Sequence, residues 1–353
     1  MMQITRFQQT PTIFLSIGLC VLSQAFAAER FAPDTVQQNG KITLTPGFAP
    51  DGKTIYFAQS ECSPIWECPQ RLKRSRLTER GWSTPELLSV TANGRVDYPS
   101  VSPDGRYLLF SWATKRARHA NRAVYEDFDL YRLDLTMTTA NPEPLDEPDI
   151  NRIRGGKLAK LRYVHNETAP VLTRDGDLYF WTERLDGLGE RDVYMAPSNG
   201  KGGFLAARAL PEPVNSKDRD NGSWISPNGK IMLLTYANRG GAGSSDLFVS
   251  YRNGENWAVP VNLGGAVNSA AEDFAATITP DHKFLVFSST RAFPGQAKGL
   301  IQVWQVALAD IPALKPSLLG QQPTGGISTA ACSFQQIRKA AQKRNIRMVE
   351  HCE

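Results

Sequence analysis

The stretch PSVSPDGRYLLF, residues 99–110, decides the fold of this chain. It holds a short run with apolar residues, a tight turn at Pro103-Asp104-Gly105, and a second apolar run that ends in an aromatic residue. Proline presets φ at the first central position of a turn, and glycine accepts the positive φ that such turns often need. The stretch therefore predicts two antiparallel strands joined by a tight turn.

The same phrase returns four more times along the 353 residues. The further turns are Pro50-Asp51-Gly52, Arg174-Asp175-Gly176, Pro227-Asn228-Gly229 and Pro280-Asp281-His282. Counted at the Asp or Asn, the five copies lie 53, 71, 53 and 53 residues apart. A period this regular indicates a repeat architecture.

Each repeat continues past its second strand in the same way. The fourth copy predicts strands over 231–236, 246–251 and 257–261, and the last of these carries Pro260. Proline cannot donate to a sheet ladder, so this strand belongs at an edge. Four strands with the proline-bearing one outermost make a propeller blade. The other copies predict strands at 54–58, 71–77 and 82–88; at 107–112 and 128–133; at 177–182 and 192–196; and at 284–289 and 300–306. The fold class is therefore all-β, a five-bladed β-propeller of four-stranded antiparallel blades.

The fifth copy lacks an outer strand of its own, and the N-terminus has the spacing to supply it. Pro33 precedes Asp51 by 18 residues, much as Pro85 precedes Asp104 by 19. We expect residues 30–36 to lie beside 300–306 and to close the ring. Closure of this kind leaves no open sheet edge between the first and last blades.

The first 27 residues have the features of a secretory signal. Arg6 gives the positive start, residues 13–22 the apolar segment, and Ala25-Phe26-Ala27 the small-x-small cleavage site. Cys20 lies inside this segment, and we expect it to be removed with the signal. We then expect residues 28–316 to form the propeller and the protein to be periplasmic or secreted.

The four cysteines that remain are Cys62, Cys68, Cys332 and Cys352. An even number in an oxidising compartment predicts two disulfides. Cys62 and Cys68 are six residues apart and can close a small ring across one loop. Cys332 and Cys352 would staple a short α/β appendix, which with its linker spans residues 317–353.

Composition and charge narrow the class of partner. Hydrophobic residues make up 41% of the sequence, which is normal for a soluble globular protein. The net charge of +5 is spread along the chain and gives no case for a nucleic-acid partner. No apolar run after the signal approaches the ~18 residues of a membrane-spanning helix. We expect a monomer.

Polar residues stand just before each predicted innermost strand, where the link from the preceding blade reaches the central channel. Such rim residues should converge although they are far apart in sequence. One interpretation is structural, because buried polar groups must be satisfied. The other is a ligand site, with which a structural cation at the rim is also compatible. The residues are Asp97, Tyr98, Asn166, Glu167, Asp220, Asn221, Glu272 and Asp273.

A second polar set lies further along the blades. Arginines follow three of the second strands, and aspartates open the third strands. We expect ion pairs between them within each blade. The residues are Arg184, Arg239 and Arg291 with Asp129, Asp192 and Asp246.

Motifs for catalysis are mostly missing. The sequence has no Gly-x-Ser-x-Gly elbow and no phosphate loop. Its four histidines are scattered without ligand spacing, and no cofactor is predicted. The chain is therefore expected to be a binding protein rather than an enzyme. The alternative is carbohydrate processing, in which two rim carboxylates would act across a glycosidic bond.

The repeats resemble the TolB-type, WD40-like propeller repeat. The matching phrases are DLF at 246–248, DLY at 129–131, DVY at 192–194, and the passage 245–287 with its W-x-x-P-V-N-L-G, N-S-x-x-E-D and T-P-D elements. The resemblance covers roughly residues 30–310. It implies an exported bacterial propeller, as a rule non-catalytic, that binds a protein, a peptide or another envelope component, glycans included, through one face. The sequence departs from the pattern at His282, which replaces the usual turn glycine.

Overall fold

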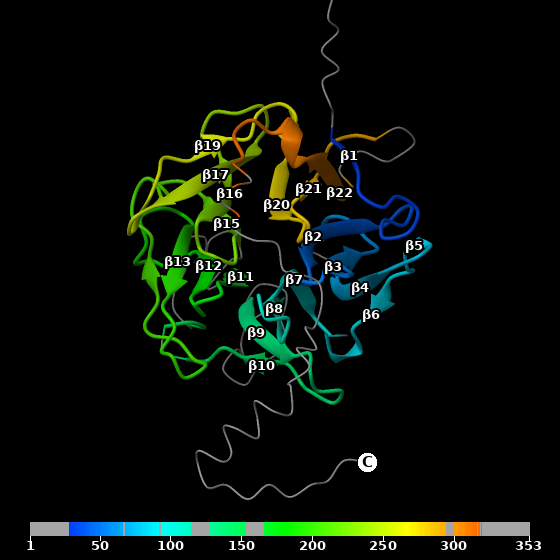
Figure 1. Ribbon diagram of the computed structural model, residues 1–353, viewed down its shortest axis with the longest axis horizontal. Helices are drawn as coiled ribbons and strands as arrows, with labels where there is room; N and C mark the ends of the chain where they lie inside the picture. The colour runs from blue at the N-terminus through cyan, green and yellow to red at the C-terminus, as the bar shows by residue number, and fades with distance from the viewer. Residues whose placement is uncertain are drawn as a thin grey trace, which may run out of the picture.

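Five small antiparallel sheets stand around a central axis (Figure 1). The computed structural model describes residues 28–65, 68–91, 93–113, 128–147, 149–152, 166–293, 300–315, 317 and 319. The predicted all-β, five-bladed propeller is confirmed. Among the described residues, the short 3-10 turns Ser89–Thr91 and Leu308–Asp310 accompany the strands.

Each blade is a meander that starts with its innermost strand. Blade 1 contains β2 (Ile42–Phe48), β3 (Thr54–Ser60) and β4 (Arg71–Thr78), with β5 (Gly81–Trp82) and β6 (Glu86–Leu87) outside. Blade 2 contains β7 (Arg95–Val101), β8 (Tyr107–Ala113), β9 (Asp129–Asp134) and β10 (Glu143–Pro144). Blade 3 contains β11 (Glu167–Leu172), β12 (Leu178–Thr182), β13 (Asp192–Ala196) and β14 (Arg208–Ala209). Blade 4 contains β15 (Asp220–Ile225), β16 (Ile231–Ala237) and β17 (Ser245–Asn253), with β18 (Asn256–Trp257) and β19 (Val261–Asn262) outside. Blade 5 contains β20 (Asp273–Ile278), β21 (Phe284–Ser289), β22 (Gln302–Ala307) and β1 (Glu29–Arg30).

The N-terminal strand closes the ring, as the sequence predicted. Glu29 and Arg30 of β1 pair with Gln305 and Trp304 of β22. The strand is shorter than expected, and the chain then turns back on itself after Phe31, whose N–H donates to the Val303 carbonyl. The outermost strand of blade 5 therefore comes from the other end of the chain.

The outer strands of blades 1 and 4 are each split in two. β5 and β6 lie on either side of Pro85, and β18 and β19 lie on either side of Pro260. The sequence predicted one continuous strand in each place. The missing proline N–H interrupts the ladder, which leaves two-residue segments paired with the third strand.

The hydrophobic core lies between neighbouring blades rather than in one central mass. Between blades 1 and 2, for example, Tyr56 and Leu72 pack with Leu108 and Phe110. Similar clusters join each of the other neighbouring pairs, including blade 5 to blade 1. Each blade is thus stabilised by both of its neighbours, which holds the inner strands in fixed positions around the channel.

Buried amide side chains fasten the links between blades. Asn215 accepts from the Val193 N–H at 2.7 Å and donates to the Val193 carbonyl at 2.9 Å. Gln37 makes the same pair of bonds with Val303 across the N-terminal closure. Asn151 and Asn268 do likewise with Leu130 and Leu247. These amides satisfy main-chain groups where the chain leaves one blade for the next.

Several predicted features lie outside the described residues. These are the signal segment 1–27 and the appendix with Cys332 and Cys352. In the part of the chain that the structure describes, no helix has the length and apolar character to cross a membrane.

Candidate functional site

The five inner strands run in the same direction along the central channel. All of them therefore begin at one mouth of the channel and end at the other. The acidic mouth is the end where these strands begin, marked by Glu167, Asp220 and Asp273, the first residues of β11, β15 and β20. The turn mouth is the end where they finish, before the five repeated turns. Every inner strand has a β-bulge between these ends. At the level of the bulges the space is a cavity of only about 20 Å³, room for about one water molecule.

The acidic mouth is built around buried ion pairs, and the first belongs to blade 3. Glu167 and Arg184 are both buried, with Arg184 Nη2 and Nε each 3.2 Å from Glu167 Oε1. The same guanidinium also donates to the Ile150 carbonyl on the preceding link. Glu167 is thus part of the joint between blades 2 and 3.

The second pair has the same form in blade 4. The Asp220 carboxylate is fully buried, 3.4 Å from Arg239 Nη2, and accepts from both the N–H and the hydroxyl of Ser216. Burial raises the pKa of Asp220 to about 6, while Ser216 and Arg239 oppose that shift. The cause is the cost of placing a carboxylate away from water.

The third pair belongs to blade 5. Asp273 is fully buried, 2.6 Å from Arg291 Nη2, and accepts from the N–H and hydroxyl of Ser269. Arg291 also donates to the Val267 carbonyl at 2.5 Å. Three of the predicted rim acids are therefore committed to arginine partners, which favours the structural interpretation for them.

These pairs correct the expected arginine partners. Pairing within a blade is confirmed, but the partners are the acids that open the inner strands, not the aspartates that open the third strands. Asp192 instead accepts from the Gly189 N–H at 3.1 Å, and Asp246 from the N–H groups of Ala242 and Gly243 at 3.3 Å. The sequence favoured the wrong partners because Asp192 and Asp246 lie only 8 and 7 residues from Arg184 and Arg239 along the chain. The acids that these arginines meet, Glu167 and Asp220, lie 17 and 19 residues away.

Asp97 and Tyr98 lie at the bulge of blade 2, half-buried. The Thr45 hydroxyl donates to Asp97 at 2.8 Å, and burial raises the pKa of this carboxyl. Tyr98 has a φ of 47° and its ring meets Trp181 edge to face at 6.3 Å. The position that Trp181 occupies in β12 holds Ser111 in β8 and Ser288 in β21, and these serines accept from the N–H groups of Ala169 and Thr45 in the next blades. This aromatic pair lies near the narrow centre of the channel.

The remaining rim residues differ in exposure. Asn166 is buried and accepts from the Phe128 N–H at 2.9 Å. Asn221 is half-buried, and Glu272 is exposed, 3.4 Å from the Ser244 hydroxyl. Among the described residues, His, Cys, Asp and Glu do not gather in a group of three or more that could hold a metal ion. A ligand role for the rim residues stays a prediction.

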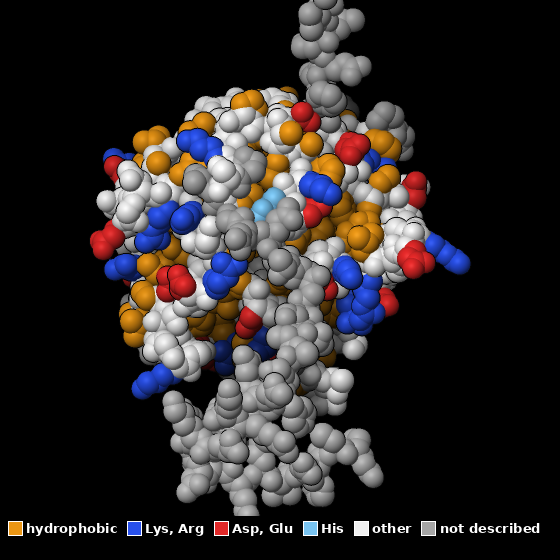
Figure 2. All heavy atoms as spheres, in the orientation of Figure 1, with side chains coloured by type: hydrophobic (Ala, Val, Ile, Leu, Met, Phe, Trp, Pro, Cys, Tyr) orange, Lys and Arg blue, Asp and Glu red, His pale blue; other side chains and the backbone are white. Residues whose placement is uncertain are grey.

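The turn mouth has a different character. A cavity of about 110 Å³ opens there, and the last residue of every inner strand lines it. These are Phe48, Val101, Leu172, Ile225 and Ile278. Figure 2 shows hydrophobic side chains on one face of the ring, with charged side chains among and around them. The turn mouth is an apolar depression to which all five blades contribute.

Leu319 belongs to this mouth although it follows the last blade. It lines the cavity with only 4% of its surface exposed, and it packs with Ile278 and Leu314. The segment before it is fixed by Tyr251, whose hydroxyl donates to the Ala313 carbonyl at 2.6 Å. A leucine side chain from outside the blades thus already packs at this mouth.

Two charged or titratable side chains stand at its rim. Arg174 and His282 both line the cavity, and they occupy the two turns in which the repeated phrase is altered. Four of the five turns have proline where Arg174 stands, and four have glycine where His282 stands. Burial lowers the pKa of His282, with Asp281 opposing, so its imidazole is neutral at neutral pH. The altered fifth turn is visible in the sequence, but no local signal there connects either alteration with a site.

A larger cleft continues from this mouth between blades 2 and 3. Its volume is about 420 Å³, and it shares Pro103, Leu172 and Arg174 with the mouth. Tyr107 and Phe204 provide aromatic walls. Arg174 therefore stands at the junction of two depressions.

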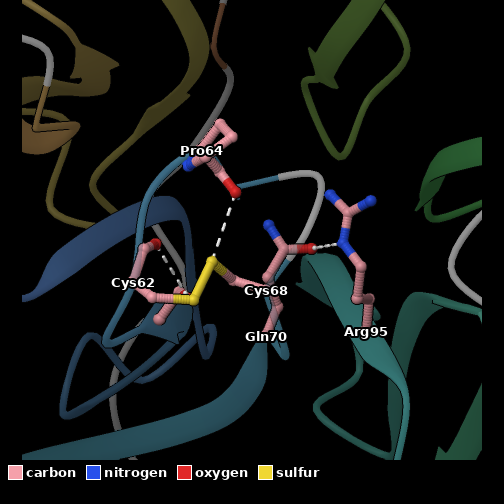
Figure 3. The surroundings of a disulfide bond; sticks show 6 residues. Cys62, Pro64, Cys68, Gln70 and Arg95 are labelled. Atoms are coloured by element: carbon pink, nitrogen blue, oxygen red, sulfur yellow. Dashed lines mark hydrogen bonds between the residues drawn. A yellow bond between two sulfur atoms is a disulfide. The ribbon is translucent and has the colours of Figure 1, made fainter.

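The predicted disulfide between Cys62 and Cys68 is present, with Cα atoms 5.8 Å apart (Figure 3). Cys68 Sγ lies 3.2 Å from the Pro64 carbonyl oxygen. Two residues further on, Gln70 accepts from Arg95 Nε at 3.0 Å, which ties this loop to blade 2. A disulfide in a small loop indicates an oxidising compartment.

Comparison with known proteins shows fold likeness at low identity. No protein-family model matches the sequence, and none of the curated proteins compared with it matches either. TolB from Acinetobacter baumannii has 16% identity and a TM-score of 0.44 over 74% of this chain and 54% of that one, so this chain spans about half of its length. A putative TolB from Agrobacterium tumefaciens has 16% identity and a TM-score of 0.44 over 78% and 80% of the two chains. A family 117 glycoside hydrolase from Zobellia galactanivorans has 13% identity and a TM-score of 0.45 over 80% and 91%. Such likeness leaves function open, and function must be argued from the site.

Proposed function

We propose that this protein is an exported, non-catalytic β-propeller that binds a peptide or protein of the cell envelope through the face that carries the turn mouth. The observation that supports it is the apolar mouth lined by all five inner strands and continued by the cleft between blades 2 and 3. Concave apolar sites with a few placed polar groups are the usual form of a binding site. The Cys62–Cys68 disulfide and the predicted signal support the exported location.

The carbohydrate-processing alternative receives less support from the contacts. It needs two carboxyl groups free to act on opposite sides of a glycosidic bond. Glu167, Asp220 and Asp273 are buried and engaged by arginine. The acidic mouth is thus better suited to joining blades than to turning over a sugar.

Site-specific photo-cross-linking tests the proposed face. A benzoylphenylalanine replaces either Lys283, exposed beside the fifth repeated turn, or Leu188, exposed on the loop between β12 and β13. We expect the Lys283 variant to form a discrete adduct with an envelope protein identified by mass spectrometry and then reproduced with that protein purified. Adducts formed only from the Leu188 position, or hydrolysis of chromogenic glycosides that depends on Asp97, would refute the proposal.

A further inference from the structure

The two altered turns place a charged and a titratable side chain at positions where the other copies have proline and glycine. The last residues of the five inner strands give the turn mouth an apolar lining. Around it stand Pro50, Pro103, Pro227 and Pro280, so without the two altered turns no charged or titratable side chain would line the mouth. Arg174 and His282 break this pattern, and they come from blades 3 and 5, which are not neighbours.

The fold itself does not require either side chain. The Arg174 N–H donates to the Pro227 carbonyl at 2.7 Å, which explains why proline is absent there. Every residue other than proline has this backbone N–H, so the hydrogen bond does not explain why the side chain is that of arginine. In the part of the chain that the structure describes, the exposed Arg174 side chain has no hydrogen-bond or ion-pair partner.

His282 is held in a conformation that favours glycine. Its φ is 56°, and its N–H donates to the Thr279 carbonyl at 2.8 Å, as the turn glycines do in the other four copies. A residue with a side chain is strained in this left-handed region, whereas glycine adopts it without that cost in free energy. Histidine occupies this position although glycine would be less strained there, which makes His282 a candidate for ligand binding.

The size of the mouth limits what can enter. A cavity of about 110 Å³ is smaller than one that holds benzene and much smaller than a drug-sized pocket. It suits a single branched aliphatic side chain. Leu319, packed at the same mouth with 4% exposure, shows that leucine fits these surroundings.

We propose that the turn mouth receives the C-terminus of a partner polypeptide, with the last, aliphatic side chain in the apolar mouth and the terminal carboxylate on Arg174. The guanidinium offers paired N–H donors that match a carboxylate, and the neutral imidazole of His282 can donate one further hydrogen bond. The preceding residues of the partner lie along the cleft between blades 2 and 3, which begins at Arg174. This proposal rests on the proposed binding function and specifies its ligand.

Matched peptides test the carboxylate requirement on the full-length mature protein. The peptides are fluorescein-GSGSAL with a free carboxylate and the same sequence with a C-terminal amide. A single anchor gives weak binding, so polarisation is followed to about 1 mM. We expect the acid to bind about tenfold more tightly than the amide, or more. Equal binding of the two peptides, or binding of neither, overturns the proposal.

Two variants locate the site, and a third serves as control. Arg174→Gln keeps the N–H to Pro227 and should abolish the preference for the acid. Leu319→Ala enlarges the mouth and should shift the preference from a terminal leucine to a terminal phenylalanine. Arg80→Gln removes an exposed arginine of the β4–β5 hairpin and should leave both results unchanged. An Arg174→Gln protein that still prefers the acid overturns the proposal.

The proposed function can be judged separately from this inference. Suppose that a partner is captured from the Lys283 position but the acid and amide peptides bind equally. The proposed binding face would then be supported, and only the recognition of a C-terminal carboxylate would be refuted. No adduct from that position, together with glycosidase activity, would remove both.

Discussion

The two mouths of the channel are made from the two ends of the same five strands, yet they have opposite character. At the acidic mouth Glu167, Asp220 and Asp273 are buried and paired with arginines. At the turn mouth Arg174 is exposed beside an apolar depression. The charged groups of the first mouth hold blades together, whereas those of the second are available to a ligand. A charged side chain in these repeats therefore indicates a binding function only where it is not already paired within the fold.

The largest expected effect tests the structural role of the acidic mouth. Asp273→Ala leaves Arg291 partly buried without its carboxylate and frees two donors of Ser269. Breaking one side of a buried pair costs about 3–5 kcal/mol of unfolding free energy. Urea denaturation measures it.

The neighbouring residue provides the matched control. Glu272 is exposed, so Glu272→Ala should change the unfolding free energy by less than about 0.5 kcal/mol. Equal losses in the two variants would contradict the distinction between paired and exposed rim acids.

The next effect concerns pH. The Asp220 pKa of about 6 lies above its unfolded value of about 3.9, so the folded state binds the proton more tightly. This group therefore stabilises the fold most below about pH 4, and that contribution falls by roughly 2–3 kcal/mol as pH rises through 6. Asp220→Asn cannot titrate and should lack this fall. Unfolding free energies of both proteins at several pH values give the difference, and a difference independent of pH would contradict the assignment.

A smaller effect of opposite sign is expected at the turn mouth. His282→Gly relieves a side chain from a φ of 56° and should raise the unfolding free energy by about 0.5–1 kcal/mol. Thermal denaturation checks it. A loss of stability would show that His282 serves the fold and not a ligand.

The smallest effect on stability is expected for the Arg174 side chain at the turn mouth. Arg174→Gln should alter the unfolding free energy by less than about 0.5 kcal/mol, because its side chain is exposed and its N–H bond to Pro227 is kept. Arg174→Pro removes that N–H and should cost about 1 kcal/mol. If the glutamine variant were as unstable as the proline variant, the guanidinium would have a structural task.

The sequence determined the blade count and the ring closure because both depend on local, repeated signals. Turns such as Pro103-Asp104-Gly105 fix a hairpin wherever they occur, and Pro85 and Pro260 mark outer strands by the N–H they lack. Cys62 and Cys68 could be paired because a six-residue spacing leaves little choice.

Only the tertiary structure decided the partners and the site. Arg239 could have met Asp246 or Asp220, and the choice depends on how neighbouring strands align across the blade. Arg174 and His282 are 108 residues apart, and nothing local brings them to one mouth. They share it because five sheets packed in a ring direct the ends of all inner strands to the same place. Local sequence fixes each hairpin, whereas the position of a side chain across the channel depends on every interface between blades.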